Sequence, residues 1–253
     1  MSRVLSIAGK ELRVAFVSPL LYVFCSSFLI LCGVFFFGIV EGFQSVVQRA
    51  ATDPAITPNL NEWVVLPYLR TVEVILLFLL PLLTMRSLAE ERSSGAFELL
   101  ITSPVSALDI VIGKYLGLAA SLLLPLSLAF MFPLALLFVA TPELLPILLG
   151  FLGVGLFVAA YLALGLACSA FTSSSAVAGI VSLVLFLLLY VADAPSGYLG
   201  GNAAEVLHYL SPATHGERFY RGVLLGSDLL YYSSLVGLGL FLSVRAIEGE
   251  RWR

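Results

Sequence analysis

Long stretches without a charged residue dominate the pattern of this chain. They cover residues 14–40, 115–142, 144–192 and 229–244. A helix that crosses a bilayer needs about 20 mostly apolar residues, so the stretches predict membrane-spanning helices and the third has room for two. A further apolar stretch, which contains the charged residues Arg70 and Glu73, supplies one more predicted span. Pro81 is expected to kink its helix. The six predicted spans are 19–40, 64–85, 113–139, 146–170, 175–192 and 227–244.

The N-terminal segment has a different, amphipathic pattern. On a helical wheel its basic residues Arg3, Lys10 and Arg13 lie opposite an apolar side. This pattern predicts a helix over residues 1–17 that lies in the membrane interface. Pro19 then starts a new helix, because a proline in the first turn has no hydrogen bond to lose.

Composition agrees with a membrane protein. The chain of 253 residues is 60% hydrophobic and only 11% charged, with a mean hydropathy of +1.05. Soluble domains carry about a quarter charged residues, so that class is excluded. A net charge of −3 with 13 basic residues argues against a nucleic-acid partner. The fold class expected is therefore all-α, a polytopic membrane protein formed by a single domain over residues 1–253.

The distribution of basic residues predicts the orientation. Nine of them fall on the side of the two termini and four on the other side. Because cytoplasmic loops carry the excess of Lys and Arg, both termini are expected in the cytoplasm. The long segment 193–226 then lies outside, and a loop of this length is expected to have structure of its own.

The most informative segment, residues 86–112, lies between the second and third predicted spans. Gly95 is expected to end a first short helix, and Ser106 to cap a second one that continues through Asp109 into the third span. The segment is thus predicted to be a helix–turn–helix parallel to the membrane. The alternative is an ordinary inner loop with solvated charges.

The order of residues here resembles a known family. From Met85 the chain reads M-R-S-L-A-E-E-R-S-S-G-A-F-E-L-L, followed by Ser103-Pro104 and by Gly113-Lys114. This is similar to the coupling helix of permease subunits of ABC-2-type transporters. The stretches from Glu11 to Tyr22 and from Leu210 to Tyr232 resemble the gliding-motility branch of that family.

The resemblance implies a permease subunit without a catalytic site, and we expect an exporter in the inner membrane. Its implied partners are a dimer of cytoplasmic ABC ATPase subunits, which hold ATP and Mg, a second copy of this permease or a homologous one, and an extracytoplasmic accessory subunit. Membrane lipid surrounds it. The chain has no G-x-x-x-x-G-K-[ST] phosphate loop, so the energy has to come from another chain. The residues expected to couple the ATPase to the spans are Arg86, Glu90, Glu91, Arg92, Gly95, Phe97 and Glu98.

The resemblance also implies that residues 193–226 dip into the outer leaflet as short helices. We expect this segment to cap the pathway between two permeases as an outer gate, with Arg218, Arg221 and Asp228 as its charged residues. Tyr198, Tyr209 and Tyr220 are expected at the interface.

The remaining candidate residues are weighed between a functional role and an ordinary structural one. Arg70 and Glu73 in the second span are spaced for mutual pairing, and either form a functional pair or reach into water at the rim. His208 and His215 are interpreted as ordinary polar loop residues, because their spacing fits no zinc motif.

The pairs Gly113 with Gly117 and Gly165 with Ser169 favour internal helix packing over a dimer face. The cysteines Cys25, Cys32 and Cys168 fit small buried hydrophobic residues.

Two other function classes stay open. A secondary transporter or channel would work without an ATPase, but ion coupling usually requires carboxylates inside the membrane, and the spans have almost none. A membrane enzyme has no candidate set of catalytic residues in this sequence.

Overall fold

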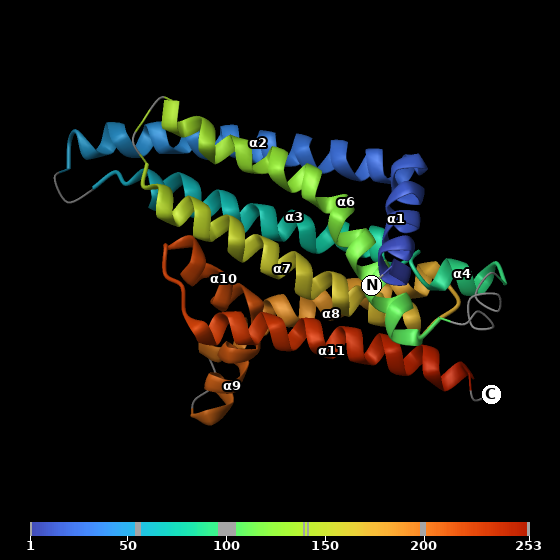
Figure 1. The fold of residues 1–253 in the computed structure, drawn as a ribbon. Helices are drawn as coiled ribbons and strands as arrows, with labels where there is room; N and C mark the ends of the chain where they lie inside the picture. Colours follow the sequence, from blue (N-terminus) through green and yellow to red (C-terminus); the bar gives the residue numbers. More distant parts are fainter. Residues whose placement is uncertain are drawn as a thin grey trace.

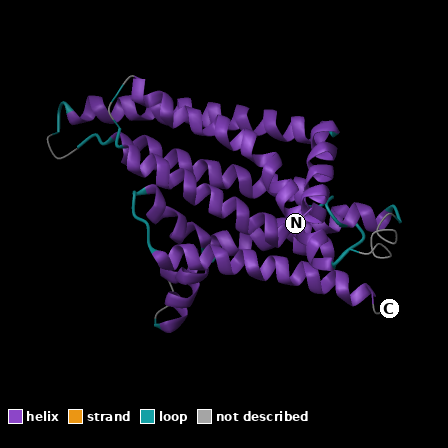
Figure 2. Cartoon of the chain, in the orientation of Figure 1, coloured by secondary structure: helices purple, strands orange, loops and turns teal. Residues whose placement is uncertain are grey.

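The computed structural model describes residues 2–53, 57–95, 105–138, 140, 142–197 and 201–251. The protein is all-helical, with 86% of its residues in helices and no strand in the described parts (Figure 2). The long helices run side by side along one axis, and both termini lie at the same end of the bundle (Figure 1). We refer to this end as the inner end and to the opposite one as the outer end.

The first two helices meet at a sharp corner. Helix α1, Ser2–Val17, crosses the inner end of the bundle, and α2, Pro19–Ala50, then runs along its length (Figure 1). Ser18 caps α2 by accepting a hydrogen bond from Leu20 N–H at 3.3 Å, and Pro19 takes the first helical position. The predicted N-terminal helix and the helix start at Pro19 are confirmed. Helix α2 continues ten residues beyond the predicted end of the span.

Five helical stretches are long and apolar enough to cross a membrane in the described part of the chain. They are Pro19–Ala50, Asn61–Ser93, Ala107–Phe138, Leu144–Ala170 and Gly226–Glu250. Their helices are α2, α3 (Leu66–Thr84, after a π-helical turn at Asn61–Val65), α6 (Ala107–Ala135, then a 3₁₀ turn at Leu136–Phe138), α7 (Leu144–Ala170) and α11 (Gly226–Arg251).

The sixth predicted span corresponds to α8, Ser175–Val191, which has only 17 residues. At 1.5 Å per residue, such a helix is about 25 Å long, slightly less than the ~30 Å of a bilayer core. A membrane helix can accommodate such a mismatch through local thinning of the bilayer. Five spans are therefore supported by length, and the sixth stays a prediction.

Helix α7 lies at the centre of the bundle. It packs against α3, α8, α10 and α11, and its inner half is almost entirely buried. Tyr161 stacks on Phe157 with ring centroids 4.1 Å apart and meets the edge of Phe186 at 4.5 Å. Helix α11 approaches so closely that a Cβ at Gly239 would lie 2.5 Å from the Ala163 carbonyl carbon. This close packing makes α7 the element around which the others are arranged.

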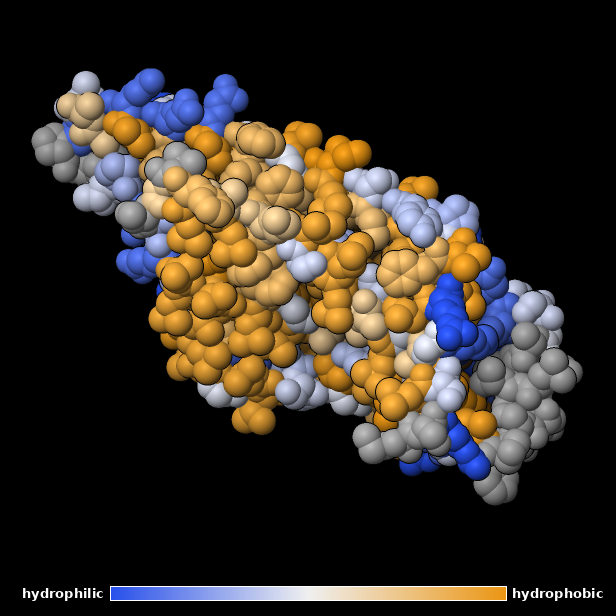
Figure 3. Space-filling model, turned by 45° about the horizontal axis from the view of Figure 1, so that its top comes forward, coloured by the Kyte–Doolittle hydropathy of each residue, from blue (hydrophilic) through white to orange (hydrophobic). Residues whose placement is uncertain are grey.

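The surface has the distribution expected of a membrane protein. Figure 3 shows a broad apolar surface over the middle of the molecule and hydrophilic residues at its two ends. On α2, for example, Ile30, Val34 and Phe37 are all exposed. Because soluble monomers rarely expose apolar surface of this extent, the middle of the bundle is suited to contact with lipid or another membrane chain.

The outer segment has the local structure that its length predicted. It contains a 3₁₀ turn at Ala194–Gly197, then α9, Asn202–Leu210, and α10, Pro212–Tyr220. Helix α10 packs against α3 and α7, and α9 projects sideways from the bundle (Figure 1). Tyr198 lies outside the described residues. The segment is thus helical and attached to the core, whereas its function as a gate stays a prediction.

Candidate functional site

The start of the predicted coupling segment is fastened to α7. Ser169, on the last turn of α7, is fully buried, and its Oγ accepts hydrogen bonds from the Leu88 and Ala89 N–H groups at 3.1 and 3.0 Å. The same hydroxyl donates to the Met85 carbonyl oxygen at 3.2 Å. One turn earlier, a Cβ at Gly165 would lie only 2.5 Å from Thr84 Oγ1. The Gly165 and Ser169 pair therefore serves packing within the chain.

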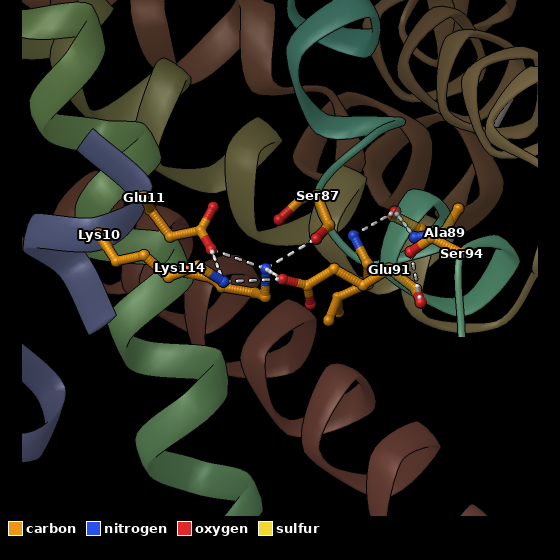
Figure 4. Close-up of polar contacts among 9 residues, drawn as sticks. Lys10, Glu11, Ser87, Ala89, Glu91, Ser94 and Lys114 are labelled. Atoms are coloured by element: carbon orange, nitrogen blue, oxygen red, sulfur yellow. Dashed lines mark hydrogen bonds and ion pairs between the residues drawn. The ribbon is translucent and has the colours of Figure 1, made fainter. Parts of the chain in front are cut away.

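Lys114, in the second turn of α6, is the centre of a buried ionic junction. Its side chain is 2% exposed, and its Nζ lies 2.9 Å from Glu11 Oε1 and 2.9 Å from Glu91 Oε1. It also donates a hydrogen bond of 2.8 Å to the Ser87 carbonyl oxygen. Figure 4 shows these groups converging from α1, α6 and the segment around α4, Ala89–Ser93. We call Lys114, Glu11, Glu91 and Ser87 the inner junction.

The glycines on either side of Lys114 allow the junction to form. A Cβ at Gly113 would lie 2.7 Å from Ile7 Cβ, and one at Gly117 would lie 2.6 Å from Glu11 Cβ. Small residues at this spacing let α1 approach α6 closely enough for the Glu11 carboxylate to reach Lys114. The prediction that Gly113 and Gly117 serve internal packing is confirmed.

The structure divides the predicted coupling residues into two groups. Glu91 pairs with Lys114 and, at 3.4 Å, with Lys10, while Arg92 pairs with Glu250 of α11 at 2.8 Å. These two side chains are committed to contacts within the chain. Arg86 and Glu90 are exposed.

Only part of the predicted helix–turn–helix lies in the described residues. Gly95 follows α4 with a φ of +75°, which glycine adopts at little cost, so the predicted end of the first short helix is confirmed. Phe97 and Glu98 lie outside the described residues. Ser106 caps α6 as predicted, since its Oγ accepts a hydrogen bond of 3.0 Å from Asp109 N–H.

A cavity of about 320 Å³ adjoins the inner junction. Its charged lining residues are Lys10, Glu11, Arg86, Glu90, Glu91 and Lys114. Apolar residues at the inner ends of the spans, including Leu21, Leu83 and Leu118, form the rest of the wall. The site is therefore a partly charged, partly apolar hollow between α1, α4 and α6.

A second buried ionic group lies at the outer end. Asp228, in the first turn of α11, is fully buried, and its Oδ1 lies 2.6 Å from His215 Nδ1 and 3.0 Å from Arg218 Nη1. His215 Nε2 lies 3.0 Å from the Tyr209 carbonyl oxygen, and its ring stacks on Tyr231. We call Asp228, His215 and Arg218 the outer clamp. The interpretation of His215 as an ordinary loop residue is wrong, because it is a buried part of α10.

The polar pair predicted in the second span does not form. Arg70 is half-exposed and pairs with Glu217 of α10, which also pairs with Arg221 at 2.8 Å. Glu73 is only 1% exposed and lies near Gly216, beside the Tyr220 hydroxyl group but outside regular hydrogen-bond geometry. The reason is the position of α10, which provides a carboxylate for Arg70 on one side and covers Glu73 on the other.

Several of these residues could not be assigned a role from sequence. Lys114 appeared only as part of a Gly-Lys motif, and Glu11 only as part of an N-terminal resemblance. The signal for both was charge placed inside or beside an otherwise apolar helix. For metals, no group of three or more His, Cys, Asp or Glu side chains suited to bind an ion occurs in the ranges that the structure covers. The described cysteines are free thiols.

Comparison with protein families identifies a model that matches this chain. A family model described as ABC-2 family transporter protein matches residues 5–247, which is nearly the whole chain. No curated protein matches the chain significantly. The matched range includes α1, the inner junction, the outer clamp and most of α11.

Proposed function

Because this chain belongs to the ABC-2 family of transporters, we propose that it is the permease subunit that couples ATP hydrolysis on a cytoplasmic ABC ATPase to movement of its spans. Permeases of this family are membrane transport subunits and normally work with such an ATPase. In this proposal ATP and Mg are bound by the partner. The chain contributes the helices that move and the segment that receives the force.

The inner junction is the observation that supports this proposal. Lys114 holds Glu91 of the coupling segment and Glu11 of α1 at the same 2.9 Å distance. A displacement of α4 therefore acts on α1 and on the base of α6 together. Arg92 adds a connection from the same short helix to α11 through Glu250. An ATPase that displaces α4 would thus move three helices instead of bending an isolated loop.

The exposed side chains of the segment are the proposed contacts with the ATPase. Arg86 and Glu90 are exposed, whereas Glu91 and Arg92 are occupied within the chain. We therefore assign docking to the first pair and force transmission to the second. Phe97 and Glu98 keep the docking role that the resemblance implies.

The wider assembly follows from the same family membership. We propose six spans with both termini in the cytoplasm of an inner-membrane exporter, and a second permease copy or a homologous permease beside it. The location of both termini at one end supports the even number of spans (Figure 1). The outer clamp, together with Arg221, is proposed to hold residues 193–226 over the pathway between the two permeases. The gliding-motility branch is the proposed subgroup.

Glu73 supports the alternative of a secondary transporter or channel. A buried carboxyl group inside a membrane helix is often a site for ion coupling. The Glu73→Gln variant separates the two functions. If the protein is an ATP-driven permease, the variant still stimulates ATP hydrolysis by the ATPase. If the protein is an ion-coupled transporter, the variant loses transport, and transport by the wild type requires no ATPase.

Co-purification tests the proposal. The tagged permease is co-expressed with a candidate ABC ATPase from the same genome, and the retained ATPase is quantified. Charge reversal at Glu90 is expected to reduce retention, and charge reversal at Glu91 is expected to uncouple hydrolysis while leaving the permease in the membrane. Arg245→Glu, at the exposed inner end of α11, is the control. Unchanged retention in the Glu90 variant contradicts the docking assignment, and unchanged coupling in the Glu91 variant contradicts force transmission.

A further inference from the structure

The cavity beside the inner junction contains polar groups that the protein itself leaves unused. Ser87 Oγ and Glu91 Oε2 are buried and have no hydrogen-bond partner among the residues that the structure describes. Ser87 is 9% exposed, so its hydroxyl group is largely removed from water. A buried polar group without a partner costs about 1–3 kcal/mol, so a bound molecule that supplies a donor here gains that interaction.

Two exposed basic side chains, Arg86 and Lys10, line the same cavity. Arg86 lies one position before Ser87. It is exposed and makes no ion pair with a described residue. Lys10 is 57% exposed, and its Nζ lies 3.4 Å from Glu91 Oε1 and 3.9 Å from Glu11 Oε1. An anionic group of a bound molecule can therefore pair with two cations. A hydrogen-bond donor of the same molecule can bind a carboxylate oxygen and a hydroxyl group.

The apolar wall indicates where the rest of the molecule lies. Leu21 lies in the first turn of α2, and Leu83 and Leu118 lie in the inner parts of α3 and α6. A second hollow, which shares Val14 and Ser18 with the cavity, extends past α1 to Arg13 and Val17. Val17 is 83% exposed on the side of this helix that also carries Lys10 and Arg13. The cavity thus continues past α1, the helix that we expect to lie in the membrane interface.

We propose that this cavity binds one phospholipid with a primary-amine headgroup from the adjacent leaflet. The phosphate group pairs with Arg86 and Lys10, and the ammonium group donates to Glu91 Oε2 and Ser87 Oγ. The acyl chains follow Leu83 and Leu118 into the bilayer. The site shares Arg86 and Glu91 with the proposed coupling segment, and its occupation adds a contact between α1 and α4 next to the inner junction.

Native mass spectrometry of the purified chain in detergent tests this proposal. The chain is titrated with phosphatidylethanolamine, phosphatidylcholine or phosphatidylglycerol of identical acyl composition. We expect one phosphatidylethanolamine to bind per chain, with weaker binding of the other two lipids, since one lacks N–H donors and the other has no amine. Loss of a charge-assisted hydrogen bond corresponds to roughly a tenfold change in affinity.

Variants locate the site. Arg86→Gln is expected to weaken binding of all three lipids about tenfold, because it removes the proposed phosphate contact of an exposed side chain. Glu91→Gln is expected to remove the preference for phosphatidylethanolamine over phosphatidylglycerol. Arg245→Gln, which removes an exposed cation of the inner end away from the cavity, is the matched control. If Glu91→Gln fails to fold, Ser87→Ala tests the same preference.

Three results overturn the proposal: equal affinity for the three lipids, unchanged binding in Arg86→Gln, or the same loss in Arg245→Gln. Soluble glycerophosphoethanolamine separates the headgroup from the lipid. If it binds to the site while phosphatidylethanolamine does not, the ligand is a free headgroup and the lipid assignment is wrong. None of these measurements involves the ATPase, so the result is independent of the coupling proposal.

Discussion

The two buried ionic groups of this protein connect the chain in different ways. At the inner junction, Lys114 binds Glu11, which is 103 residues away in the sequence, as well as Glu91. At the outer clamp, Asp228 binds His215 and Arg218, which are 13 and 10 residues away. The junction therefore joins three separate elements, whereas the clamp fastens α10 to the helix that follows it.

The central charges also differ in sign and in their surroundings. The inner centre is a cation shared by two carboxylates beside a cavity, and the outer centre is a carboxylate shared by a histidine and an arginine under Tyr231. A connection between distant elements can transmit a displacement, while a local connection holds a segment in place. We expect the two groups to respond differently when they are disrupted.

Replacement of the central cation at the inner junction is expected to have the largest effect. Lys114→Met leaves Glu11 and Glu91 without their shared partner, and breaking a buried pair costs on the order of 3 kcal/mol. The measurement is thermal unfolding of the purified chain in detergent. The control is Arg245→Met, whose side chain is 64% exposed. An equal loss of stability in both variants would refute the difference between buried and exposed cations.

The outer clamp is expected to be the next most sensitive. Asp228→Asn removes the charge that His215 and Arg218 share, and hydrogen bonds to charged groups contribute about 1.5–3 kcal/mol. Limited proteolysis of residues 193–226 should accelerate, while cross-linking between α1 and α6 stays unchanged. Glu205→Gln on the exposed side of α9 is the control. Faster cleavage at the inner end would show that the clamp acts beyond its own segment.

A smaller effect is expected from the packing that brings α1 to Lys114. Gly117→Ala places a Cβ 2.6 Å from Glu11 Cβ and 3.1 Å from the Ala8 carbonyl oxygen. Overpacking of this kind costs about 1–3 kcal/mol. Gly155→Ala is the matched control, since nothing lies within 4 Å of its Cβ. Thermal unfolding compares them, and equal stability of the two variants means that α1 is not held against α6 as described.

The smallest expected effect is a dependence on pH at the outer end. Burial raises the pKa of Glu217, but hydrogen bonds from Arg221 and the charges of Arg70 and Arg221 outweigh it and hold that pKa below its usual value. Because the folded state lowers this pKa, the stabilisation is present above the unfolded value, about 4.3, and is lost as the pH falls through the lower folded value.

Thermal unfolding of the wild type and of Glu217→Gln between pH 7 and pH 3 measures this contribution. The wild type should be the more stable at pH 7, and the difference should diminish at acidic pH. If the difference in stability between the wild type and Glu217→Gln grows as the pH falls, its sign is opposite to this prediction. The ion pairs of Glu217 with Arg70 and Arg221 are then excluded as the source of the stabilisation.

The local features of the fold were predictable because their signals are local. The helix start at Pro19, the turn at Gly95 and the cap at Ser106 each depend on one residue and its near neighbours. The end of α2 was not predictable in this way. Charge at Glu41 and Arg49 ends the apolar span but not the helix, which continues to Ala50.

The ionic groups were less predictable because they depend on packing between helices. Arg70 and Glu73 have a spacing that allows a pair, yet α10 offers Glu217 to Arg70 instead. Nothing in the spacing of Glu11, Glu91 and Lys114 indicates that they meet. Their contact requires α1 to fold back across the inner end and the glycines beside Lys114 to admit it.

A double-mutant cycle between Glu91 and Lys114 tests the coupling role of the inner junction most directly. The readout is the ATP hydrolysis that the permease stimulates in its partner ATPase, measured for the wild type, Glu91→Gln, Lys114→Met and the double variant in lipid nanodiscs. The two residues act through one contact in our account, so each single variant should lose most of the stimulation and the double variant should lose little more. Stimulation that stays at the wild-type level, or losses that simply add, would contradict a junction that transmits force from the coupling segment to the spans.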